Sequence, residues 1–215
     1  MNSSDKPPQE ESHFNRESRG SSAPVRLRVK LVEEELQRAS LASLGNTVIW
    51  SEGTARVKVI ASPVVLDALL RVESFSDRWE DGGFLIGSVY RDSEAGDDAY
   101  LVNITAAPRA QATTSSLVHL TYTGDSFSEI KRLLRDEFRG QQLLGWYHSH
   151  LFAAQEEMGL SGPDVHLHFS TFRQPWQIAG LINLPVDGEA TLRFYAAQDK
   201  EMARCRVYRL EANQP

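Results

Sequence analysis

Two histidines and an aspartate in this chain could together bind a transition metal. His148 and His150 are separated by one residue, and Asp164 follows after a short spacer. Imidazole nitrogens and carboxylate oxygens are typical zinc ligands, and a catalytic zinc site keeps one position open for water beside three protein ligands. The pattern therefore predicts a catalytic metal site, although a His-x-His pair can also be two polar residues at a strand edge.

The predicted elements around these residues could bring the ligands together. The apolar segment 143–147 indicates a strand that leads into His148 and His150. Alternate residues of a strand project to the same side, so the two histidines would face the same way, roughly 6.6 Å apart at their backbones, and the serine between them would face away. Ser161 stands two residues before a proline and could cap a helix that holds Asp164 near the strand end.

A glutamate and a glycine-rich segment lie upstream of the histidines. Glu80 is followed by Asp-Gly-Gly-Phe-Leu-Ile-Gly, which ends at Gly87. With this segment the chain resembles the JAMM (MPN+) zinc metalloproteases, whose signature is a glutamate before a Gly-x-Leu-x-Gly strand, then His-x-His, then Ser-x-x-Asp. The resemblance extends from about residue 55 to residue 197. Segments 144–150 and 174–179 look like those of bacterial, deubiquitinase-like isopeptidases of this family.

The resemblance implies a role for each residue of the signature. Glu80 matches the general base, His148, His150 and Asp164 match the ligands of one zinc ion per chain, and Ser161 matches the serine that supports the oxyanion. All five positions are filled in this sequence. Hydrolysis of an amide is the reaction that such a site would perform.

The implied substrate is the bond after the C-terminal glycine of a ubiquitin-like protein, cleaved in deconjugation or in precursor processing. The expected partner is therefore a ubiquitin-like protein or its conjugates. Two alternatives stay open: a peptidase that trims a sulfur-carrier protein, and a non-catalytic MPN scaffold in a protein complex. Scaffold members usually lack one or more of the metal residues, and this chain keeps all of them.

The spacer between the second histidine and the serine departs from the family pattern. It covers the ten residues 151–160, longer than is usual, and Leu151 replaces the usual proline. A loop between two ligand-bearing elements must lie beside the metal. Glu156 and Glu157 could reach the open metal position as a lid, contact a basic substrate tail, or lie on a plain surface bulge.

Composition favours a globular intracellular protein. Of the 215 residues, 41% are hydrophobic and 24% charged, and the net charge of −6 gives no basic footprint for nucleic acid. No segment has the ~20 apolar residues of a membrane span or resembles a signal peptide. The single Cys205 cannot form an internal disulfide and is expected to be a packed or surface thiol. We therefore expect a cytoplasmic protein without a membrane or nucleic-acid partner.

The chain divides into three predicted parts. Residues 1–24 are polar and predict a disordered tail. Residues 25–54 form an N-terminal extension, with a strand predicted at 25–31 and a helix at 33–44. Residues 55–215 are expected to form the metalloprotease domain.

Strands and helices mingle along the chain, which predicts an α/β or α+β fold with strands of mixed direction. The resemblance implies an MPN/JAMM-type mixed sheet sandwiched by helices, similar to cytidine deaminase. Strands are predicted at 47–51, 55–60, 84–90, 99–105, 143–147, 177–184 and 190–197, and helices from 63, over 125–138 and from Ser161. In the last helix His168 lies one turn after Asp164, where it could orient that ligand or be an ordinary surface histidine.

Overall fold

The computed structural model describes residues 35–111, 113–115, 120–154 and 159–211. The predictions for the tail 1–24 and the strand 25–31 lie outside these residues, and so do Glu156 and Glu157. The residues from Glu35 onward belong to one compact unit.

A large curled sheet dominates the described part of the chain. It has ten strands, in the order β11-β10-β9-β8-β4-β5-β3-β12-β2, with β1 paired to β4 off this path. A separate hairpin consists of β6 and β7. The strands are β1 (Arg38–Ala39), β2 (Thr47–Ser51), β3 (Val57–Ala61), β4 (Gly82–Asp92), β5 (Tyr100–Ala106), β6 (Thr113–Ser115), β7 (Leu120–Tyr122), β8 (Gln142–His150), β9 (Ile178–Asn183), β10 (Thr191–Gln198), β11 (Glu201–Arg204) and β12 (Arg206–Leu210).

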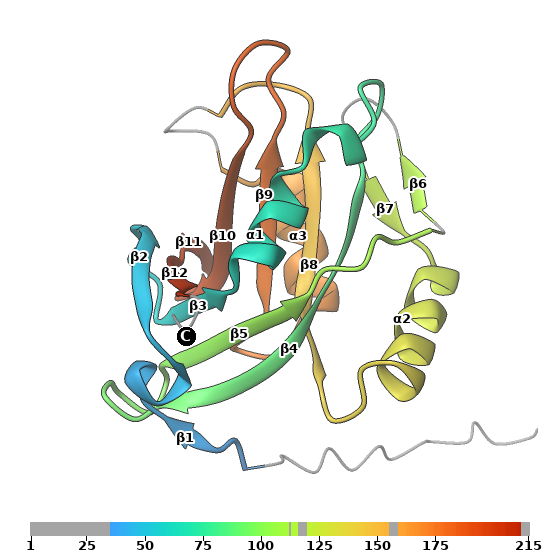
Figure 1. Ribbon diagram of the computed structural model, residues 1–215. Coiled ribbons are helices and arrows are strands. Elements are labelled where there is room, and N and C mark those ends of the chain that lie inside the picture. Colours follow the sequence, from blue (N-terminus) through green and yellow to red (C-terminus); the bar gives the residue numbers. More distant parts are fainter. Residues whose placement is uncertain (1–34, 112, 116–119, 155–158, 212–215) are drawn as a thin grey trace, which may run out of the picture. The chain divides into compact units, whose positions relative to one another are not determined.

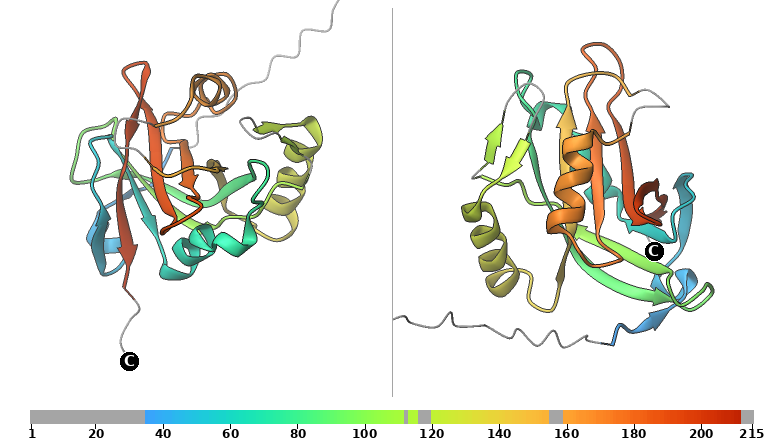
Figure 2. Two further views of the ribbon diagram at one scale, coloured as in Figure 1. Left: turned by 90° about the horizontal axis from the view of Figure 1, so that it is seen from above. Right: turned by 180° about the vertical axis from the view of Figure 1, so that it is seen from behind.

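The sheet is mixed and carries helices on both faces. β8 pairs parallel to β9 and β3 pairs parallel to β5, whereas β4 is antiparallel to both β5 and β8. The α-helices are α1 (Pro63–Leu70), α2 (Gly124–Asp136) and α3 (Gly162–Thr171). Figure 1 shows α1 in front of β9, and α3 comes to the front when the molecule is seen from behind in Figure 2. The α+β class and the mixed strand direction are thus confirmed.

Local sequence signals explain where the helices begin. Ser62 caps α1 by accepting a hydrogen bond from the backbone N–H of Val65, and Thr123 forms a capping box with Ser126 at the start of α2. The large apolar residues of the helix predicted over 125–138 all pack in one cluster with Phe84 and Trp146. They are Phe127, Ile130, Leu133, Leu134 and Phe138.

The helix predicted over residues 33–44 is wrong for its described residues. Arg38–Ala39 is a short strand instead, and Leu41–Leu44 is a short 3₁₀ helix, η1. The backbone of Ala39 accepts a hydrogen bond from Ser93, and the Arg38 guanidinium pairs with Asp97 at 2.6 Å. Pairing with the end of β4 therefore overrides the helical spacing of this segment.

Two strands near the C-terminus were missing from the prediction. β11 extends the sheet beyond β10, and β12 lies between β3 and β2. β2, which the prediction placed in the N-terminal extension, pairs antiparallel with β12 and so belongs to the main sheet. Cys205 between β11 and β12 is fully buried, which confirms a packed thiol, and burial raises its pKa.

The described helices are short compared with the thickness of a bilayer. α2, with 13 residues, exceeds α1 and α3 in length. Within the described ranges no helix combines the length and apolar character that crossing a membrane requires.

Gly145 in β8 provides a test of how the histidine strand is built. Its φ is +152°, and a Cβ added there would lie 1.8 Å from the carbonyl oxygen of Ile178. We expect Gly145→Ala to lower the free energy of unfolding by about 3 kcal/mol or more, because strain and a backbone clash add. Urea denaturation measures this change. Gly124→Ala is the matched control, since nothing lies within 4 Å of its added Cβ; an equal loss of stability in both variants would contradict the prediction.

Candidate metal centre

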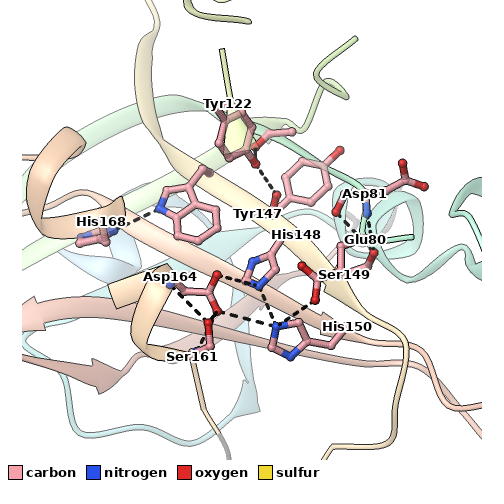
Figure 3. Close-up of polar contacts among 12 residues, drawn as sticks. Glu80, Asp81, Tyr122, Tyr147, His148, Ser149, His150, Ser161, Asp164 and His168 are labelled. Atoms are coloured by element: carbon pink, nitrogen blue, oxygen red, sulfur yellow. Dashed lines mark hydrogen bonds and ion pairs between the residues drawn. The ribbon is translucent and has the colours of Figure 1, made fainter. Parts of the chain in front are cut away.

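Three separate segments bring the predicted site residues to one place. His148 and His150 are among the last three residues of β8. Glu80 lies two positions before β4, and Asp164 is in the first turn of α3. Gly82 of β4 pairs with His148, so continuing this antiparallel register places Glu80 alongside His150, the last residue of β8. Figure 3 shows the four side chains turned toward one another.

The polar atoms of these side chains lie close together. The Nε2 atoms of His148 and His150 are 3.0 Å apart, and the carboxylate of Asp164 lies 3.3 Å from the first and 3.7 Å from the second. Glu80 Oε1 lies 3.7 Å from His150 Nε2. All four residues are at least nine-tenths buried.

Glu80, His148 and His150 form a group that could hold a metal ion. One ligand atom from each lies within 4.8 Å of the others. The two Nε2 atoms face each other at 3.0 Å, and in the tautomer that carries its proton on Nδ1 each ring can direct its Nε2 lone pair at one shared cation. The donor set therefore fits a metal ion at this point.

Ser161 fixes the carboxylate of Asp164. Its hydroxyl donates to Asp164 Oδ2 at 2.6 Å and its backbone N–H donates to the same oxygen at 2.8 Å. In return, the Asp164 N–H donates to Ser161 Oγ at 3.3 Å, which completes a capping box at the start of α3. The predicted helix start at Ser161 is confirmed, and one oxygen of Asp164 is held by the cap while Oδ1 is the atom nearest His148.

The pKa values of the site residues differ in direction. Burial raises the pKa of Glu80 to about 7, with His150 lowering it and Asp164 raising it. Burial also raises the pKa of Asp164, but hydrogen bonding from His148, His150 and Ser161 outweighs this and sets it well below its usual value. Burial lowers the pKa of His148. At neutral pH the site therefore holds an aspartate anion and a neutral histidine, the forms that bind metal.

His168 contacts Trp146, a partner that the sequence did not indicate. It is fully buried, so the prediction of a surface histidine is wrong. The indole N–H of Trp146 donates to His168 Nδ1 at 3.3 Å, and the Trp146 ring stacks on His148 with centroids 4.9 Å apart. His168 thus holds a ring that covers one face of a site histidine.

Ser149 and Asp81 are further contacts that the sequence analysis missed. The Asp81 N–H donates to Ser149 Oγ at 3.0 Å, and the Ser149 N–H donates to the Asp81 carbonyl at 2.8 Å. The residue between the two histidines therefore binds the residue after Glu80. Nothing in the sequence pairs these residues, which are 68 positions apart.

Two partly exposed aromatic residues lie next to site residues along the chain. Phe152 follows His150 in the spacer, and their ring centroids are 4.8 Å apart. Trp79 precedes Glu80 and is 47% exposed. The part of the spacer that carries Glu156 and Glu157 lies outside the described residues, so its proposed lid stays a prediction.

Comparison with known proteins gives information on the fold. No protein-family model and no curated protein matches the chain. The solution structure of protein DSY2949 from Desulfitobacterium hafniense is similar, with a TM-score of 0.52 and 16% sequence identity over 72% of this chain and 94% of that chain. At this identity the likeness shows a shared fold alone.

His168 predicts a pH dependence of stability. Burial lowers its pKa to about 4, against 6.5 for the ordinary side chain. Between pH 6.5 and 4, His168 is protonated in the unfolded chain and neutral in the folded chain. The free energy of unfolding therefore falls as the pH drops from 6.5 toward 4. We expect His168→Gln to remove about 2 kcal/mol of this fall between pH 6.5 and 4.5. Urea denaturation of metal-free protein at both pH values measures it, and parallel pH curves for variant and wild type would contradict the assignment.

Proposed function

We propose that this chain is a zinc-dependent amide hydrolase of the JAMM (MPN+) type. The observation that carries the proposal is the convergence of His148, His150, Asp164 and Glu80 on one buried point from three separate segments. Residues of the signature that are far apart in the sequence thus lie together in the fold, and Ser161 lies beside them.

The geometry supports His148, His150 and Asp164 as the zinc ligands. A tetrahedral zinc with bonds of about 2.0–2.1 Å places neighbouring ligand atoms about 3.3 Å apart. His148 Nε2 lies 3.0 Å from His150 Nε2 and 3.3 Å from Asp164 Oδ1. Asp164 is preferred to Glu80 as the carboxylate ligand, because its lowered pKa keeps it ionised whereas Glu80, at about 7, is partly protonated at neutral pH.

The remaining residues suit the steps of amide hydrolysis. Zinc, when bound, supplies a Lewis acid that makes water acidic enough to lose a proton near neutral pH. Glu80 would accept that proton and return it to the leaving amine, since a pKa near the working pH suits a general base that must also act as an acid. The Ser161 hydroxyl donates to Asp164 in the resting site and could rotate to donate to the developing oxyanion, while the Ser161 N–H continues to hold Asp164.

The proposed substrate is a peptide or isopeptide bond after the C-terminal glycine of a ubiquitin-like protein. This part of the proposal comes from the family resemblance. An extended, glycine-ending tail could bind by adding backbone hydrogen bonds beside the active-site sheet. Cleaving a ubiquitin-like conjugate and a sulfur-carrier fusion side by side distinguishes the two substrate classes.

The first prediction of this proposal concerns zinc content. We expect about one zinc ion per chain in the purified protein, and its loss in His148→Ala and Asp164→Ala, because each removes one of three ligands. Elemental analysis by mass spectrometry measures the ratio. Wild-type protein that cannot be loaded with zinc would refute the proposed function.

The second prediction separates Glu80 from the ligands. Glu80→Gln should keep its zinc, because the three ligands are unchanged, and should slow cleavage of a ubiquitin-like fusion by on the order of 10²–10⁴. Zinc content and turnover are measured on the same preparation. Loss of zinc in Glu80→Gln would instead make Glu80 a ligand, and near-normal turnover would remove it from the mechanism.

A further inference from the structure

We propose that Ser149 and Arg109 position Glu80 by fixing its neighbour Asp81, Ser149 through the backbone and Arg109 through the side chain. The inference rests on the proposed function in so far as it takes Glu80 to be the general base. Neither Ser149 nor Arg109 is expected to touch zinc or substrate, so both are positioning residues.

The need for such positioning follows from the surroundings of Glu80. Its carboxylate is buried and lies 3.7 Å from His150, but it accepts no hydrogen bond from any of the described residues. Among the described residues no side chain holds the carboxylate by a hydrogen bond, so its location depends on where the backbone at residues 80–81 is held. A general base must come within hydrogen-bond reach of its proton, and a misplacement of about 1 Å can cost about 10²-fold in rate.

Ser149 supplies the first anchor. Its side chain is fully buried and accepts a hydrogen bond from the Asp81 N–H at 3.0 Å. Its own N–H donates to the Asp81 carbonyl at 2.8 Å. β4 begins at Gly82, so these bonds extend the β4–β8 ladder one residue toward Glu80. The serine thus sets the distance between the strand that carries both histidines and the segment that carries the base.

Arg109 supplies the second anchor from the other side. Its guanidinium pairs with Asp81 Oδ2 at 2.7 Å, and the same oxygen accepts a hydrogen bond from the Ser76 N–H at 2.6 Å. Arg109 also donates to the Ser74 carbonyl and lies over the Phe75 ring, 4.9 Å from its centroid. The Arg109 guanidinium thus links Ser74 to Asp81 at the two ends of segment 74–81. Together with the bonds from Ser149, it fixes both the backbone and the side chain of Asp81.

The experiment compares four single variants. Ser149→Ala removes the hydroxyl, Ser149→Thr keeps it, and Arg109→Gln loosens the exposed anchor without touching the buried one. Ser88→Ala is the matched control, because it makes the same change in β4 beyond the far end of the β4–β8 ladder. For each, zinc content, kcat and KM for a ubiquitin-like fusion, and hydrogen exchange of the Asp81 amide are measured.

A positioning role gives a distinct set of results. Ser149→Ala should keep one zinc per chain and its KM, lose about 10–100-fold in kcat, and exchange the Asp81 amide about tenfold faster or more. Ser149→Thr should restore most of kcat, and Arg109→Gln should lower kcat by about 3–10-fold with zinc unchanged. Ser88→Ala should resemble wild type. In a Glu80→Gln background, Ser149→Ala should cost no more than about twofold further, because the group that it positions is already gone.

Three results on zinc and activity would overturn the inference, and a fourth concerns amide exchange. The first three are a kcat for Ser149→Ala within twofold of wild type, loss of zinc in that variant, or an equal loss of kcat in the Glu80→Gln background. Loss of zinc, or an equal loss of kcat without Glu80, would mean that Ser149 supports the histidines and not Glu80. The amide exchange does not depend on activity: if wild type binds no zinc or cleaves nothing, the proposed function fails, whereas unchanged exchange at Asp81 in Ser149→Ala refutes the anchor itself.

Discussion

The antiparallel pairing of β4 with β8 is the constraint on which the site depends. The ladder runs from Gly87 opposite Gln142 to Gly82 opposite His148, and it brings the segment before β4 alongside the histidines. Space at this ladder is tight: a Cβ at Gly83 would lie 2.2 Å from the Pro108 carbonyl oxygen. The Tyr122 hydroxyl lies 3.0 Å from the Gly83 carbonyl and 2.7 Å from the Tyr147 carbonyl, so one side chain from β7 spans both strands. A shift of register by one residue would move both histidines to the opposite face and separate them from Glu80.

Burial gives the site its chemistry and also makes it costly to fold. Two carboxylates and two imidazoles with low exposure lose hydration, and their mutual contacts recover only part of that loss. The Trp146 ring on one face of His148, with Phe172 packed on Trp146 at 6.1 Å, keeps this side of the site apolar. The same desolvation raises the pKa of Glu80 to about 7, a value that an exposed glutamate would not have. The cluster is therefore not expected to stabilise the fold, and its burial is better explained by a functional role.

Local signals in the sequence predicted local structure, and contacts between distant segments escaped them. Three features depend only on residues close together in the sequence, and the structure has all three. They are the apolar period of α2, the strand that leads into His148, and the cap at Ser161. The segment 35–44 has helical spacing too, but pairing with the end of β4 decides its structure. Spacing alone leaves His168 as a surface residue or a neighbour of Asp164, because its partner Trp146 lies 22 positions away. The approach of Glu80 to the histidines was expected from the family resemblance, since spacing alone gives no reason for it.

The start of α3 shows how a common folding device can orient the carboxylate of Asp164, a proposed metal ligand. A capping box satisfies two backbone N–H groups at a helix N-terminus, and here its acidic member is Asp164. Because Ser161 uses both its N–H and its hydroxyl on Oδ2, the carboxylate cannot turn freely, and Oδ1 stays 3.3 Å from His148. The positive end of the helix dipole also favours the ionised carboxylate. The orientation and charge of this carboxylate are therefore set by the folding of α3, so a metal ion bound as proposed would not have to order it.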